Sequence, residues 1–124
     1  MSKARALVDT SVLVRFFVEA DTTFSNLLSE YEIWIPDAVF FETAFVLKSV
    51  YQVDRVVIFD KLSAIALDTR IDCNKEILLN TLLDFKNHPN LGLIDCYLLN
   101  LARKHKLKLE SFDKKLKRKI KISD

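Results

Sequence analysis

Two acidic residues lie where a lone charge would be costly. Glu42 lies in the apolar segment 38–47, and on a helix its neighbours one turn away are all apolar: Ala38, Phe41, Phe45 and Val46. Asp95 repeats the pattern in segment 91–102, beside Leu91, Ile94, Leu98, Leu99 and Ala102. Because a carboxylate on a core-facing helix stripe is expensive unless a cation or hydrogen bonds compensate, the two acids predict a shared compensating group.

Two further acids follow segments that are predicted to be strands. Asp9 comes after Ala6-Leu7-Val8, and Asp113 comes shortly after the alternating segment 106–111. In parallel α/β sheets, ligands bind beyond the carboxyl ends of the strands, so both acids are expected at that edge. If the helices with Glu42 and Asp95 pack across the same edge, four carboxylates converge.

Such a cluster needs a counter-ion. Two carboxylates about 5 Å apart repel by about 3 kcal/mol at an effective dielectric near 20. An all-oxygen site suits Mg²⁺ or Mn²⁺, and the chain lacks His and Cys at the spacing of zinc ligands. Water bound to such an ion is the usual nucleophile of a hydrolytic enzyme, so the four acids predict metal-dependent hydrolysis.

The elements that must position these acids alternate along the chain. Strands are expected at 4–8, 32–35, 70–72, 106–111 and 120–122, and helices at 12–19, 37–51, 54–67, 74–86 and 93–104. This order predicts an α/β fold, a three-layer α/β/α sandwich around a mainly parallel sheet of four to five short strands. The chain has 124 residues and shows no repeat or linker, so it is expected to form a single domain over 1–124.

Composition excludes several classes of function. The single glycine, Gly92, excludes a Walker loop and a dinucleotide-binding fingerprint, which each need at least two. No apolar run approaches the ~20 residues of a membrane span, and the apolar stretch before Asp9 is too short for a signal peptide. Cys73 and Cys96 form no CxxC pair and are expected to be reduced thiols in a cytoplasmic protein without membrane contact.

The net charge of +2 conceals an uneven distribution. Residues 103–121 hold ten of the 19 Lys and Arg but two of the 17 acids, so this segment carries +8 and the rest of the chain −6. A basic end on an acidic body predicts a polyanionic partner, although a solvated basic tail would have the same composition. Arg103, Lys114 and Lys115 are the expected phosphate contacts.

At these residues the sequence resembles the PIN-domain family, and within it the VapC-like toxins of toxin–antitoxin pairs. The resemblance covers almost the whole chain, in four segments that each contain one of the acids: 7–14, 36–47, 93–102 and 109–116. Glu110 departs from the usual pattern, which has a small residue or Thr before the position of Ser111. The family resemblance implies an α/β PIN-like fold and a ribonuclease dependent on Mg²⁺ or Mn²⁺.

The resemblance also implies roles for individual residues. Asp9, Glu42, Asp95 and Asp113 would be the catalytic, metal-binding acids, while Thr10, Ser11 and Ser111 would orient those ligands or a water. The implied partners are an RNA substrate, a second copy in a homodimer, and a small antitoxin protein that covers the active site.

Three alternatives compete with this hypothesis. A haloacid-dehalogenase-like phosphatase needs a second Asp two residues after the first, where this chain has Ser11, and a response-regulator receiver needs an acid pair before the phosphorylated Asp. His88 and His105 are expected to be a loop residue and a helix-end residue, and no set of residues for a protein nucleophile is present. A catalytically inactive RNA-binding or protein-interaction module on the same scaffold remains open, although four retained acids favour an enzyme.

Overall fold

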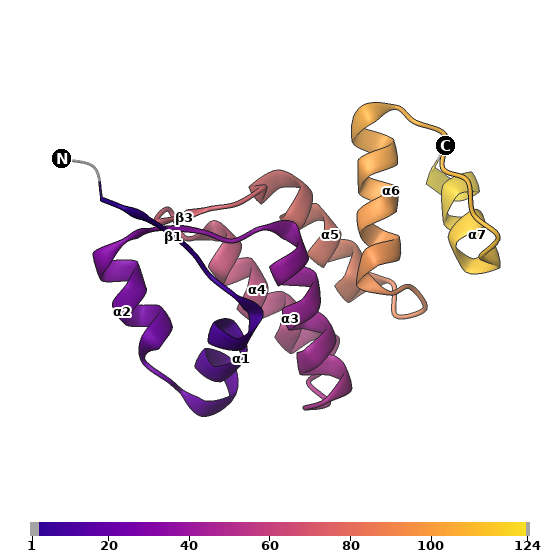
Figure 1. The fold of residues 1–124 in the computed structure, drawn as a ribbon. Coiled ribbons are helices and arrows are strands. Elements are labelled where there is room, and N and C mark those ends of the chain that lie inside the picture. The colour runs from indigo at the N-terminus through magenta and orange to yellow at the C-terminus, as the bar shows by residue number, and fades with distance from the viewer. Residues whose placement is uncertain (1–2, 124) are drawn as a thin grey trace.

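The computed structural model describes residues 3–123, which form three strands and seven helices (Figure 1). In chain order these are β1 (Arg5–Leu7), α1 (Thr10–Glu19), α2 (Thr23–Glu30), β2 (Glu32–Trp34), α3 (Asp37–Ser49), α4 (Arg55–Leu67), β3 (Ile71–Asp72), α5 (Lys75–Asn87), α6 (Leu93–His105) and α7 (Lys114–Ser123). No helix in this part of the chain is both long and apolar enough to cross a membrane.

The strands form one parallel sheet in the order β1-β2-β3. Ala6 lies opposite Ile33, and Ile33 lies opposite Ile71. The predicted α/β class with a parallel sheet is confirmed, but the described residues form three strands instead of four or five. The two strands expected at 106–111 and 120–122 account for the difference.

The two faces of the sheet have opposite character. Ile33 and Ile71 point into the core and are 0% and 2% exposed. On the opposite face, Leu7 is 63% and Trp34 45% exposed. Parallel sheets are usually covered on both faces, because each crossover connection places a helix over one of them. Here one face is open to solvent.

The helices bury apolar stripes against the inner face and against one another. Helices α4 and α5 pack against each other, and their residues Ile58, Leu62, Leu78 and Leu82 are each at most 1% exposed. Helix α3 packs on α1 and α4. Helix α2, which was not predicted from the sequence because it is only eight residues long, is held by Phe24 and Leu28, one turn apart and both buried.

The prediction of strands in the C-terminal region was wrong. Residues 107–111 belong to no helix and pair with no strand in the described part of the chain, and 120–122 belong to α7. The reason is the end of α6, where Lys106 adopts a left-handed conformation with φ 54° and the chain turns away from the sheet. Without a neighbouring edge, an alternating segment has no ladder to join.

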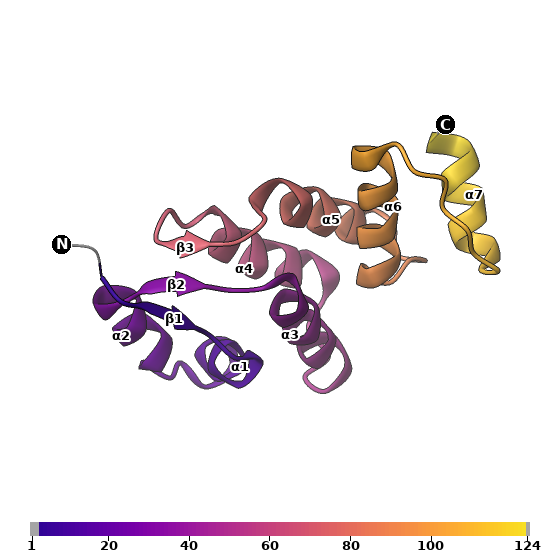
Figure 2. The same ribbon diagram turned by 45° about the horizontal axis from the view of Figure 1, so that its top comes forward.

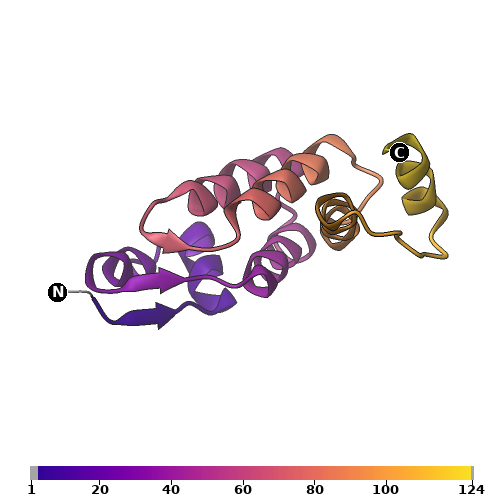
Figure 3. The same ribbon diagram turned by 90° about the horizontal axis from the view of Figure 1, so that it is seen from above.

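We call residues 107–123 the C-terminal arm. Figures 1, 2 and 3 all show α7 beyond α6, at the end of the molecule opposite the N-terminus and away from the sheet. Leu116 is 2% exposed and anchors α7, whereas Leu107 is 63% and Phe112 100% exposed. Of the arm's side chains that the structure describes, Leu116 belongs to the core and Leu109 packs against it.

Candidate acidic site

Asp9 begins α1 directly after β1. Its Oδ2 accepts a hydrogen bond of 2.8 Å from the Ser11 hydroxyl and one of 3.4 Å from the Ser11 amide. The Ser11 hydroxyl, followed by the backbone amides of Thr10 and Ser11, holds the pKa of Asp9 below its usual value. The carboxylate is exposed and ionised, and Ser11, expected to orient a ligand, is in contact with it.

Glu42 lies on a different side of α3 from the one predicted. The buried stripe of α3 consists of Phe40, Thr43, Ala44 and Leu47, and Glu42 is exposed. The expectation that Glu42 faces the core was wrong, because α3 packs on α1 and α4 through that neighbouring stripe. Its charge is solvated and needs no buried partner.

Asp95 lies in the first turn of α6 and is half-buried. Its Oδ2 accepts a hydrogen bond of 3.3 Å from the amide of Gly92, the residue that caps α6. Two of its expected apolar neighbours, Ile94 and Leu98, are 50% and 37% exposed, so its face of α6 is only partly in the core. Asp95 borders a groove of about 300 Å³ between α3 and α6, lined also by Phe41 and Phe45.

Asp113 begins α7 and lies on the C-terminal arm. Its Oδ1 accepts hydrogen bonds from the amides of Lys115 (2.8 Å) and Leu116 (3.1 Å), and its own amide donates to the Ser111 hydroxyl at 2.9 Å. Asp9, Asp95 and Asp113 therefore all lie at helix starts, where amide groups and the helix dipole favour a negative charge.

The four acids do not form a common cluster in one chain. Among the described residues, no three side chains of Asp, Glu, His or Cys are close enough together to hold a metal ion. Asp9 follows β1 and Asp113 precedes α7, and these two elements lie far apart, with α7 beyond α6 (Figure 2). The carboxylate oxygens of these acids are the donor type that suits Mg²⁺ or Mn²⁺.

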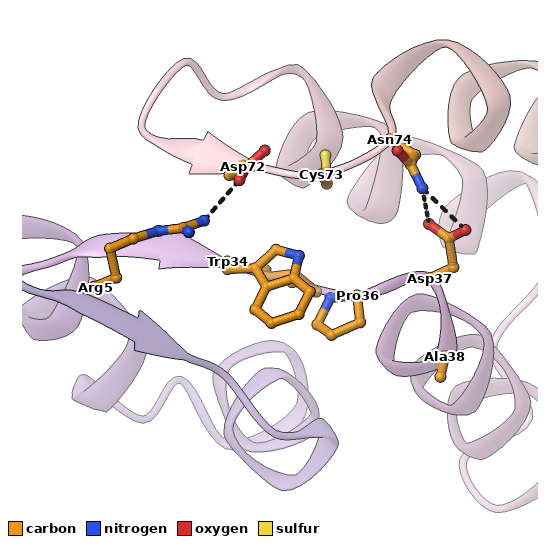
Figure 4. Close-up of a pocket in the computed structure, with 9 residues that line it drawn as sticks. Arg5, Trp34, Pro36, Asp37, Ala38, Asp72, Cys73 and Asn74 are labelled. Carbon is orange, nitrogen blue, oxygen red and sulfur yellow. Dashed lines mark hydrogen bonds and ion pairs between the residues drawn. The ribbon is translucent and has the colours of Figure 1, made fainter.

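A second polar site lies at the carboxyl ends of β2 and β3, on the open face of the sheet (Figure 4). It is a pocket of about 630 Å³, partly lined by Trp34. At one side Arg5 forms a 2.7 Å ion pair with Asp72, and at the other the Asn74 amide donates to both oxygens of Asp37 at 3.2 Å. These contacts tie the first turns of α3 and α5 to each other and β1 to β3.

Asp37 also receives a hydrogen bond from α6. The Tyr97 hydroxyl donates to Asp37 Oδ2 at 2.9 Å, and the Tyr97 ring packs edge-on against Phe41 with centroids 4.6 Å apart. Burial, and then the bond to Asp37, raises the pKa of Tyr97. This contact was not predicted from the sequence, since Asp37 after Pro36 indicates only a helix start.

The expected phosphate contacts differ in their surroundings. The Arg103 guanidinium bonds to Asp84 Oδ2 at 3.2 Å, and the Asn100 amide bonds to the same oxygen at 2.8 Å, so Arg103 helps to hold α6 on α5. Lys114 and Lys115 are exposed on α7. The two lysines are accessible to an anionic partner.

Comparison with known proteins gives one result. A family model described as PIN domain matches residues 6–122. Neither the curated proteins nor the solved structures that were compared match the chain. PIN domains are generally nucleases and typically use divalent metals, which indicates a nuclease-type function here. Since the match covers nearly every residue and the observed α/β fold agrees with it, the chain belongs to the PIN domain family.

Proposed function

We propose that the protein is a Mg²⁺- or Mn²⁺-dependent endoribonuclease in which Asp9, Glu42, Asp95 and Asp113 are the metal-binding acids. The observation that carries the proposal is Asp9, an exposed, ionised carboxylate at the carboxyl end of β1 that the Ser11 hydroxyl orients at 2.8 Å. Membership of a family of nucleases supports the reaction class.

The chain's own residues prepare the acids for this role. Ser11 fixes one oxygen of Asp9, and the Gly92 amide fixes one oxygen of Asp95. Ser111 accepts the amide of Asp113 and so sets the turn before α7, while Thr10, 6% exposed, supports the start of α1. A bound divalent ion would supply an activated water and neutralise charge on the phosphate. Forming its site requires Asp113 to approach Asp9.

The basic arm supports RNA as the substrate. Residues 103–121 carry a net charge of +8, and Lys114 and Lys115 flank Asp113 on α7. A cluster of acids repels a phosphate backbone, so nearby cations are needed to bring RNA close. The arm places such cations next to one of the four acids.

The same proposal includes the biological role of a cytoplasmic toxin with a cognate antitoxin protein, as in VapC-like pairs. Its support is the resemblance of the four acidic segments to those toxins. Arrest of growth on expression of the wild-type chain, and normal growth with Asp9→Asn, is the expected result.

The test of the activity is cleavage of a mixed RNA pool with Mn²⁺. Asp9→Asn and Asp95→Asn should each reduce cleavage at least a hundredfold, and a chelator should abolish it in the wild type. Asp21→Asn is the matched control, because Asp21 is also an acid at a helix start, accepting from the Thr23 amide at 2.8 Å, but is not among the proposed ligands. Full cleavage by either of the first two variants would refute the assignment.

The second candidate is an RNA-binding module without catalysis. The separation of the four acids in one chain, over the residues that the structure describes, favours it. This function predicts that the chain retains RNA in a filter-binding assay but yields no cleavage products at any Mn²⁺ concentration.

A further inference from the structure

The open face of the sheet presents charged side chains around one aromatic ring. The side chains of Arg5 and Asp72 are 57% and 68% exposed there, and Glu32, opposite Arg5, is exposed as well. A parallel sheet that is covered by helices on both faces is built from nearly continuous apolar runs. The charged positions on this face therefore favour a polar, hydrated partner over an apolar helix.

Trp34 is the aromatic residue of this face. It ends β2, is 45% exposed, and its ring lies between Arg5 and Pro36 at the pocket of about 630 Å³ (Figure 4). The Arg5 guanidinium is 6.0 Å from the ring centroid, and its 2.7 Å ion pair with Asp72 holds it there. The ion pair also offsets the charge of Asp72, which would otherwise repel a phosphate. An exposed aromatic ring beside a guanidinium is a surface on which a nucleobase can stack.

Trp34 and Asp9 share this face of the sheet. Trp34 is the parallel partner of Leu7, and its carbonyl accepts the Val8 amide at 3.2 Å. The backbone of Asp9 is still extended (φ −85°, ψ 158°), so side chains alternate between the two faces from Leu7 to Asp9. Val8 is 1% exposed and belongs to the core, whereas Leu7 and Asp9 are exposed on the opposite side. With strands about 5 Å apart and about 3.3 Å per residue, the Cα atoms of Trp34 and Asp9 are about 8 Å apart.

We propose that an unpaired base of the RNA stacks on the Trp34 ring, within about two nucleotides of the bond to be cleaved. Successive stacked bases are about 3.4 Å apart, so the distance from Trp34 to Asp9 corresponds to about two nucleotides. A base inside a duplex has both of its faces covered by neighbouring bases, which is why the stacked base must be unpaired. The position of the cut rests on the proposed function, whereas the stacking itself requires only that the chain binds RNA.

The fluorescence of the protein tests the stacking directly. Trp34 is the single tryptophan of the sequence, so the emission reports on this site. The probe is a ten-nucleotide RNA of alternating C and A, the C/A strand, which does not pair with itself, and a chelator prevents its cleavage. Because a stacked base quenches an indole, the C/A strand should quench the emission until the site is saturated. The duplex of this strand with its complement, and inorganic polyphosphate, should leave the emission unchanged. No quenching by the C/A strand, or equal quenching by the duplex or by polyphosphate, would overturn the stacking.

Two variants measure how much the ring contributes to binding. Trp34→Leu should weaken the binding of the labelled C/A strand about tenfold in fluorescence anisotropy, because it removes one base–aromatic stack. Trp34→Phe keeps a flat ring and should retain most of the affinity. The matched control is Tyr51→Leu, at an aromatic residue of the same 45% exposure after the end of α3, and it should bind as the wild type does. Circular dichroism checks folding, and equal affinities of Trp34→Leu and wild type would contradict the proposal.

The position of the cut tests the link to the proposed function. With Mn²⁺, an RNA with one abasic nucleotide should be cleaved about tenfold more slowly when that nucleotide lies within two positions of the cut, and Trp34→Leu should lose this dependence. A dependence that Trp34→Leu retains, or one on more distant nucleotides, would overturn the placement beside Asp9. Quenching by the C/A strand without any cleavage would refute the nuclease function and leave the stacking intact. Cleavage without quenching would refute the stacking and leave the nuclease function intact.

Discussion

At the scale of single residues, three of the four candidate acids share one local device. Asp9, Asp95 and Asp113 each accept amide hydrogen bonds at a helix start. Such bonds fix the direction of a carboxylate and satisfy amide groups that the first helical turn leaves without a partner. Each of these acids therefore has a structural role at the start of its helix, besides the metal-binding role proposed for it.

Ser11→Ala should raise the pKa of Asp9 toward its ordinary value of 3.8, because the Ser11 hydroxyl is the largest cause of the lowered value. The lowered pKa means that Asp9 stabilises the fold at neutral pH, and that this contribution is lost as the pH falls through the folded-state pKa. Carbon-detected NMR titration of the Asp carboxyl groups measures the change. Ser29→Ala, whose hydroxyl donates to the Asn26 carbonyl, is the control and should leave Asp9 unchanged.

Arg55 holds together the end of α5 and the loop that precedes α6. Its guanidinium donates to the carbonyls of Phe85 (2.9 Å) and Leu91 (2.7 Å) and lies 4.1 Å from the Phe85 ring centroid. Arg55→Met keeps the packing but removes these bonds, and should lower the free energy of unfolding by about 2 kcal/mol. Urea denaturation measures this free energy of unfolding. Arg70→Met, which removes only an exposed ion pair with Asp68, should lower the free energy of unfolding much less.

At the scale of elements, the placement of α6 decides where two of the acids lie. Helix α6 contains Asp95 and ends where the arm with Asp113 begins. It contacts α5 extensively and α3 less, and its polar attachment to α3 is the bond from Tyr97 to Asp37. The strength of that attachment should respond to pH.

Tyr97→Phe should lower the free energy of unfolding at neutral pH by about 1 kcal/mol, since it removes the hydrogen bond but keeps the ring on Phe41. The raised pKa of Tyr97 means that its stabilising contribution is complete below the ordinary value of 10.0 and is lost as the pH rises through the folded-state pKa. Thermal unfolding of wild type and variant should therefore converge at alkaline pH. The control Tyr51→Phe, at a 45% exposed residue, should change neither the free energy of unfolding at neutral pH nor its dependence on pH. A difference between wild type and Tyr97→Phe that stays constant across pH would contradict the role given to the Tyr97 hydroxyl.

At the scale of the whole molecule, charge is separated along the chain. The proposed contact between RNA and the arm, with net +8 over 103–121, should weaken with salt. The side chains of α7 are the expected RNA contacts.

Lys114→Ala/Lys115→Ala should weaken RNA binding uniformly across sequences. The slope of the logarithm of affinity against the logarithm of salt concentration should fall by about 1 for each phosphate that is no longer neutralised. The oligomeric state should stay unchanged. Fluorescence anisotropy with labelled RNA at several salt concentrations measures the slope. Lys3→Ala/Lys48→Ala, which removes the same charge from the body, should alter the slope much less, and equal effects would show that the arm has no special role.

Local patterns in the sequence were sufficient to predict the class of fold. The apolar run before Asp9 and the helical spacing of 54–67 and 74–86 predicted elements that the structure contains, because local propensity and burial agree there. The four candidate acids could also be identified from the sequence, because the chemistry of a site depends first on which functional groups the chain contains. The order of the acidic segments suggested the family to which the chain belongs.

Only the tertiary structure decided the directions and neighbours of those groups. Glu42 faces solvent because α3 packs through the adjacent stripe, and a rotation of one residue position on a helix is invisible to composition. Segment 107–111 alternates as a strand should, yet strand formation requires a partner edge, and α6 carries the segment away from the nearest one. Residue types and periodicity can be read along the chain itself. The pairing of strands and the convergence of side chains depend on contacts between segments that are distant in the sequence, and these contacts exist only in the tertiary structure.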